Sequence, residues 1–125
     1  MTASDFKTAL QEHLNSIKNR DIDAFEKFFS PHYSAMVILP NGVKIEGNEE
    51  IIDFHKQWFE DDDWQMETRV VDCFEMENMG YVLLDVDYED MDEDGKPYQM
   101  SYYLSMLFAK TNCGWVLLRD QNTLK

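Results

Sequence analysis

His13 is the side chain that best fits acid–base chemistry, because it lies in the middle of an apolar stripe. Phe6, Leu10, Leu14 and Ile17 recur around it at spacings of three and four residues, as on one face of a helix. An imidazole on such a face could act as a base near neutral pH. The alternative is a core histidine whose ring nitrogens are bonded by neighbours. The sequence leaves both interpretations open.

His55 and Trp58 form a second candidate group, on the apolar face of a helix expected to begin at Gly47 and Asn48. Side chains three residues apart are neighbours on one side of a helix. The pair could offer a ligand one polar group and one stacking group. For Trp58 the competing role is simple core filling, because aromatic stripes at helical spacing usually pack.

These residues belong to three predicted helices, which precede four long predicted strands. Ser4 or Asp5 can cap the first helix, and Asp21 can cap a short second helix that ends before Pro31. Strands that exceed the usual five or six residues must twist and bend around a filling. We therefore expect one α+β domain over residues 1–125, with a strongly bent antiparallel sheet around the helices. The strands are predicted at 33–39, 43–45, 64–77, 81–91, 98–110 and 115–123.

Charge and composition exclude several classes of partner. The chain has 11 basic and 25 acidic residues and a net charge of −14, which repels phosphate backbones and anionic lipid headgroups. We therefore expect neither nucleic acid nor a membrane as a partner. No apolar run approaches the roughly 18 residues of a membrane span, and the first residues lack a secretory signal pattern, so a cytoplasmic location is expected. Cys73 and Cys113 are expected to be reduced packing residues.

Residues 90–95 (DMDEDG) match the start of a calcium-binding EF-hand loop. The closing position, which should be a bidentate glutamate, is Ser101, and strands are expected on both sides. An acidic hairpin turn is the better interpretation. The sequence shows no zinc or iron spacing and no Gly-rich phosphate loop, so we expect no metal and no cofactor.

The order of elements resembles the cone-shaped nuclear-transport-factor-like fold, and within it the SnoaL-like and ketosteroid-isomerase-like proteins. The matching segments are NRDIDAF at 19–25, PNG at 40–42, IEG at 45–47 and GWVLLRDQNT at 114–123. This fold hosts isomerases, cyclases, dehydratases and catalytically silent binding domains, so the resemblance implies the fold more strongly than an activity.

The resemblance also implies where catalytic groups belong. His13 falls at the position of a tyrosine that donates a hydrogen bond to substrate in the isomerase-like group. The carboxylate that such an isomerase needs before the hairpin proline is replaced by Leu39, and its acid partner falls near Leu104. Proton transfer by the known isomerase arrangement is therefore not expected.

Strand alternation divides the two closing strands into an inner and an outer face. The resemblance implies that Arg119 and Gln121 look into the cone, together with Tyr98 and Tyr102 of the preceding strand. Arg119 could then bind a carboxylate or enolate oxygen, and its alternative role is an ion pair with one of the many acidic residues. The outer face carries apolar and small residues, and proteins that this chain resembles often pair through that face. We therefore expect a homodimer. That outer set is Ser101, Tyr103, Ser105, Leu107, Val116 and Leu118.

Two functional hypotheses follow. The first is a domain that binds a small apolar or weakly anionic molecule, either inert or performing cofactor-free acid–base chemistry through His13. Under this first hypothesis the ligand contacts His55, Trp58, Tyr98, Tyr102, Arg119 and Gln121. The second is a non-catalytic dimerisation or scaffold module whose cone is filled by its own side chains, which the missing carboxylate at Leu39 favours.

Overall fold

The computed structural model describes residues 6–125, and its helices lie where the sequence predicts them. They are α1 (Phe6–Lys18), α2 (Ile22–Glu26) and α3 (Asn48–Glu60). Asp21 caps α2 as expected, because its side chain accepts a hydrogen bond from the Ala24 amide at 3.2 Å. The cap expected at Ser4 or Asp5 lies outside the described residues. No helix in the described part of the chain is long and apolar enough to cross a membrane.

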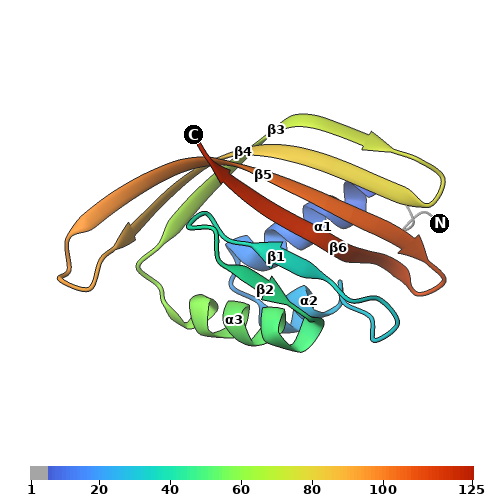
Figure 1. The fold of residues 1–125 in the computed structure, drawn as a ribbon, viewed down its shortest axis with the longest axis horizontal. Helices are drawn as coiled ribbons and strands as arrows, with labels where there is room; N and C mark the ends of the chain where they lie inside the picture. Colours follow the sequence, from blue (N-terminus) through green and yellow to red (C-terminus); the bar gives the residue numbers. More distant parts are fainter. Residues whose placement is uncertain (1–5) are drawn as a thin grey trace.

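The strands form a single curved, unclosed sheet that arches over the helices (Figure 1). Its order is β2-β1-β6-β5-β4-β3, and every neighbouring pair is antiparallel except β1 with β6, which is parallel. The bent α+β architecture is therefore confirmed, and the parallel pair is an addition to the expected antiparallel sheet. The strands are β1 (Met36–Ile38), β2 (Lys44–Glu46), β3 (Gln65–Glu75), β4 (Met79–Met91), β5 (Pro97–Thr111) and β6 (Gly114–Leu124).

The core fills the space between the helices and the concave face of the sheet, and His13 lies within it. Its ring is fully buried and packs against Phe25, Phe28 and Phe108, with centroid distances of 5.4, 4.8 and 5.3 Å. Within residues 6–125, neither ring nitrogen has a hydrogen-bond partner. The core position matches one of the two interpretations of the sequence, but the expectation that neighbours bond its nitrogens is wrong.

This environment keeps His13 uncharged. Burial, with a smaller contribution from nearby His55, lowers the pKa of His13 to about 3. An unfolded histidine binds a proton near pH 6.5. Between these two pH values the unfolded state therefore binds more protons than the folded state, and stability is lost as the pH falls.

We predict that His13→Leu weakens the acid sensitivity of the fold. At pH 5 the wild-type chain should lose about 2 kcal/mol of unfolding free energy at His13 relative to pH 7.5. The leucine variant loses the ring contacts but also removes two unsatisfied polar atoms, so its stability at pH 7.5 should stay within about 1 kcal/mol of wild type. Urea unfolding followed by circular dichroism at both pH values measures the difference.

The exposed His32 provides the matched control. His32→Leu should retain the wild-type difference between pH 5 and pH 7.5. Equal pH dependence in His13→Leu and wild type would show that His13 is not held neutral in the core.

Candidate functional site

A cavity of about 420 Å³ opens between α3 and the concave face of the sheet. Its lining is mainly apolar, with aliphatic and thioether side chains from α1, β1, β3 and β5. Its side chains with polar atoms or aromatic rings include His55, Trp58, Tyr88, Tyr98, Tyr102, Asp120 and Asn122. A pocket that is mostly apolar with a few convergent polar groups is the usual form of a small-molecule site.

His55 and Trp58 line this cavity, as the helical spacing predicts. The Nδ1 of His55 lies 2.8 Å from the Ile51 carbonyl oxygen, to which it must donate a hydrogen bond because a carbonyl can only accept. The ring is therefore the tautomer with a lone pair on Nε2, and burial lowers its pKa to about 4. Trp58 stacks on Trp64 at 4.1 Å and donates its indole hydrogen to the Tyr88 hydroxyl at 3.2 Å.

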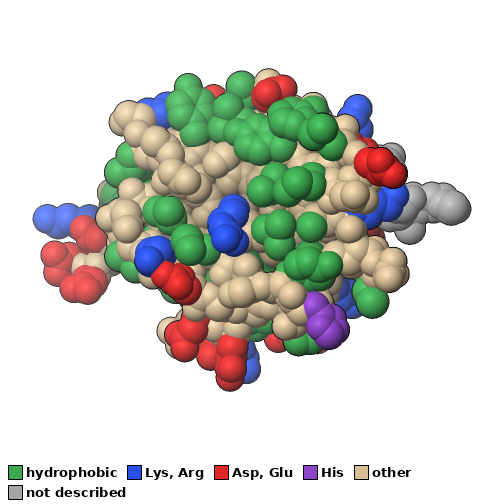
Figure 2. All heavy atoms as spheres, turned by 45° about the vertical axis from the view of Figure 1, so that its right-hand side comes forward, with side chains coloured by type: hydrophobic (Ala, Val, Ile, Leu, Met, Phe, Trp, Pro, Cys, Tyr) green, Lys and Arg blue, Asp and Glu red, His purple; other side chains and the backbone are tan. Residues whose placement is uncertain are grey.

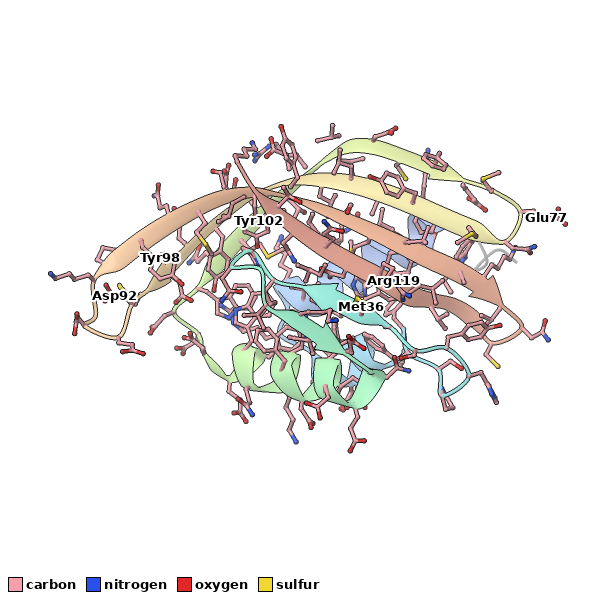
Figure 3. All side chains as sticks on the ribbon, in the orientation of Figure 1. Met36, Glu77, Asp92, Tyr98, Tyr102 and Arg119 are labelled. Carbon is pink, nitrogen blue, oxygen red and sulfur yellow. The ribbon has the colours of Figure 1, made fainter. Side chains whose placement is uncertain are left out.

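Tyr98 and Tyr102 also line the cavity, so the inner face of β5 is predicted correctly. Tyr102 is buried, and this burial, together with the charge of Asp120, raises the pKa of its hydroxyl. The hydroxyl therefore stays protonated at neutral pH and can donate a hydrogen bond. Tyr98 lies near the start of β5, toward the hairpin at Asp92 (Figure 3).

Arg119 and Gln121 do not line the cavity, and the expectation that they face it is wrong. Both are exposed, and the Arg119 guanidinium donates to the backbone oxygens of Leu118 at 2.7 Å and Ser34 at 3.4 Å. In Figure 3 Arg119 lies beside Met36, its partner in the β1–β6 register. The cavity therefore lacks the fixed positive charge that the sequence suggested.

The physical reason is a β-bulge in β6. Leu107 pairs with Arg119, but the next residue of β5, Phe108, pairs with Leu117, so Leu118 has no partner. One extra residue shifts the alternation of a strand by one and moves every later side chain to the other face. Trp115 and Leu117 face inward before the bulge, and Asp120 and Asn122 face inward after it.

Asp120 is the functional candidate that the sequence reasoning missed. Its side chain is buried at the cavity wall, and burial raises the pKa of the carboxyl to about 7. The hydrogen bond from Asn122 opposes this rise only in part. A signal for the bulge exists at 115–118, where four successive apolar residues (WVLL) interrupt the alternation expected of a strand.

Asn122 holds the Asp120 carboxyl in place. Its amide nitrogen donates to Asp120 Oδ1 at 3.1 Å and to the Ile38 carbonyl oxygen at 2.7 Å. The parallel pairing of β1 with β6 brings Ile38 within reach, because Val37 is the register partner of Asp120. The carboxyl is therefore oriented by a side chain that is itself fixed to the backbone of the neighbouring strand.

Two other groups lie outside the cavity lining. His13 sits beneath it among phenylalanine rings, whereas Ile17, one helical turn later, reaches the lining. Asp61, Asp62 and Asp63 follow α3 and place carboxylate oxygens within 4.8 Å of one another, a spacing that could hold a metal ion. Such clusters are common on acidic surfaces without an ion, and no other feature of the described residues points to a metal there.

Comparison with solved structures identifies the architecture. A ketosteroid isomerase-like protein from Erwinia carotovora atroseptica matches with a TM-score of 0.76 at 15% identity, over 94% of this chain and 92% of that one. A protein with a cystatin-like fold from Caulobacter vibrioides gives 0.78 at 14% identity, over 95% and 86%. The association domain of CaMKII from C. elegans gives 0.66 at 19% identity, over 94% and 92%. At these identities the likeness shows the fold alone.

Comparison of sequences identifies the family. No curated protein matches the chain. The model of the SnoaL-like domain, in contrast, matches residues 7–121, which is nearly the whole chain. The chain therefore belongs to the SnoaL-like domain family.

Proposed function

We propose that the chain binds a small, mainly apolar molecule in the cavity and transfers a proton on it without a cofactor. The observation that carries this proposal is the Asp120 carboxyl, whose pKa burial raises to about 7 at the wall of an apolar cavity. A catalytic acid–base group works best when its pKa lies near the operating pH, so that both protonation states are populated. In this role Asp120 takes the place that the sequence suggested for His13, which reaches no part of the cavity lining.

The reaction that suits these groups is a proton shift next to a carbonyl. The Asp120 carboxylate removes a proton from the carbon beside the carbonyl, and the electron pair of that bond moves to the carbonyl oxygen. The Tyr102 hydroxyl, which stays protonated, donates a hydrogen bond to the enolate oxygen. The same carboxyl then returns the proton to carbon, so no redox partner or cofactor is consumed. Asn122 keeps the carboxyl oriented through both steps.

We predict that the protein catalyses exchange of carbon-bound hydrogen for deuterium in an apolar cyclic ketone. The test incubates 2-tetralone with the protein in D₂O and follows deuterium uptake by mass spectrometry. The protein-dependent rate should rise with pH through about 7, as Asp120 loses its proton. Asp120→Asn should lower that rate at least about 100-fold, the usual contribution of a general base.

The exposed Asp53 on α3 gives the matched control, and Asp53→Asn should exchange at the wild-type rate. Circular dichroism verifies that both variants are folded. The proposal is contradicted if wild-type protein adds nothing to the buffer rate, or if Asp120→Asn retains the wild-type rate.

A second candidate function, association of the chain with itself, is favoured by the outer face of the sheet. Figure 2 shows apolar side chains over a broad face of the molecule, with a Lys or Arg side chain near its middle and acidic groups mainly at its margins. Phe74 and Tyr103 are 50% and 40% exposed there. Large exposed apolar areas mark interaction sites, and one of the similar structures is an association domain. Pairing through this face leaves the cavity on the other side of the sheet free, so the two functions are compatible.

We predict a homodimer that a charge at the centre of the outer face disrupts. Ser105 lies on β5 between Leu83 and Gln121 of the neighbouring strands. Ser105→Arg should shift the mass measured by light scattering at micromolar concentration from dimer to monomer, because it adds a second positive charge to a face that already carries Arg119 beside Leu107. Gln57→Arg, which adds the same charge on exposed α3, should stay dimeric. A monomeric wild-type chain would contradict the prediction.

A further inference from the structure

The cavity has an aromatic end, formed by Trp58, Tyr88 and Tyr98. The centroids of Trp58 and Tyr88 are 6.2 Å apart, and those of Tyr88 and Tyr98 are 6.5 Å apart. The planes of the first pair of rings differ by 38° and those of the second pair by 51°. The three rings therefore line a corner of the cavity and do not form a flat stack. Tyr98 is 38% exposed, which brings this end of the cavity to the surface.

The polar atoms of Trp58 and Tyr88 at the aromatic end already have hydrogen-bond partners. The Tyr88 hydroxyl accepts a hydrogen bond from the Trp58 indole at 3.2 Å and donates one to Asp90 Oδ2 at 2.6 Å. Neither donor is therefore free to recognise an oxygen of a ligand. What these residues offer to the cavity is the faces of their rings, which carry partial negative charge.

Carboxylates lie close to the aromatic end. Asp90 is the cross-strand neighbour of Tyr98 and bonds the Tyr88 hydroxyl. Burial, followed by the negative charges of Asp90 and Asp61, raises the pKa of Tyr98. Both tyrosine rings are thus close to negative charge, which strengthens the attraction of a cation.

No lysine or arginine among the described residues lines the cavity. Arg119 points to the surface, where its guanidinium donates to backbone oxygens. Arg20 holds its guanidinium 3.9 Å from the centre of the Trp64 ring, and Trp58 stacks on Trp64 at 4.1 Å with nearly parallel rings. Each face of the Trp64 ring has room for only one such neighbour, so Arg20 and Trp58 lie on opposite faces. Trp64 therefore separates the Arg20 guanidinium from Trp58. An anionic ligand would therefore meet Asp120 without any compensating cation.

We infer that the cavity takes a molecule with an apolar body and a cationic nitrogen, a tertiary amine or a quaternary ammonium group, held at the aromatic end by Trp58, Tyr88 and Tyr98. This inference rests on the proposed function in treating the cavity as a ligand site, and it replaces the weakly anionic ligand expected from Arg119. Aromatic faces with a nearby carboxylate are a recurrent means of binding such cations.

The apolar body has a defined place. From Tyr98 to Leu104 the inward side of β5 advances roughly 20 Å at the usual rise of about 3.4 Å per residue, less where the sheet bends. Met100 lies on this stretch, and Leu104 pairs with Asn122 beside Asp120. An elongated ligand with its cation at the aromatic end would therefore lay its other end near the Asp120 carboxyl.

The test compares probes of matched shape on the purified full-length chain. Benzyltrimethylammonium and neopentylbenzene differ only in a charged nitrogen against a neutral carbon, and phenylacetate carries the opposite charge. Affinities are measured by NMR titration with the indole signals of Trp58 as the reporter. The cation should bind about tenfold more tightly than its neutral isostere, and phenylacetate should bind most weakly. Equal or tighter binding of neopentylbenzene, or no binding of the cation, would overturn the inference.

Two variants locate the preference. Asp90→Asn should reduce the cation-to-neutral ratio to about threefold, and Tyr98→Leu should bring it near one, whereas Asp53→Asn should leave it unchanged. A ratio that survives both substitutions contradicts the assigned position. The exchange of 2-tetralone, a neutral probe, reports on Asp120 separately. If Asp120→Asn loses exchange but the wild-type chain shows no preference for the cation, only this inference is contradicted. If the wild-type chain prefers the cation but Asp120→Asn exchanges at the wild-type rate, only the proton-transfer proposal is contradicted.

Discussion

The β-bulge at Leu118 is the constraint on which the site depends. By leaving one residue of β6 unpaired, it turns Asp120 and Asn122 toward the cavity and Arg119 toward the surface. Without the bulge, strict alternation would place an arginine in the cavity and a carboxylate outside. The same residue types would then build a site for anions. The bulge therefore decides the sign of the charge that a ligand meets.

Burying the Asp120 carboxyl has a cost in stability. The folded state binds its proton with a pKa of about 7, and the unfolded state with a pKa near 3.8. The contribution to stability is thus fully present below pH 3.8 and is lost as the pH rises through 7, by about 4 kcal/mol in all. His13 and His55 act in the opposite sense over part of this range, since their pKa values are lowered by burial. Of these three groups, Asp120 and His55 line the cavity, and groups with pKa values shifted in this way are typical of functional sites.

Most of the fold could be predicted from the sequence because its signals are local. Helical stripes, the Asp21 cap and the turns between strands each depend on a few neighbouring residues. Simple alternation predicts the inner face of β5, including Tyr98 and Tyr102. It fails for β6 beyond Leu117, because the bulge at Leu118 is fixed by pairing with β5. His13 shows the same limit: an apolar stripe predicts burial, but not whether the buried ring reaches a cavity.

The proposed site requires that the buried Asp120 carboxyl titrate near neutral pH. Carbon-13 NMR of the chain labelled at the aspartate carboxyl carbons measures this directly, with Asp120→Asn assigning the signal. We predict a titration midpoint near 7 for the signal that disappears in the variant. A midpoint near 3.8, the ordinary value for an aspartate, would contradict it.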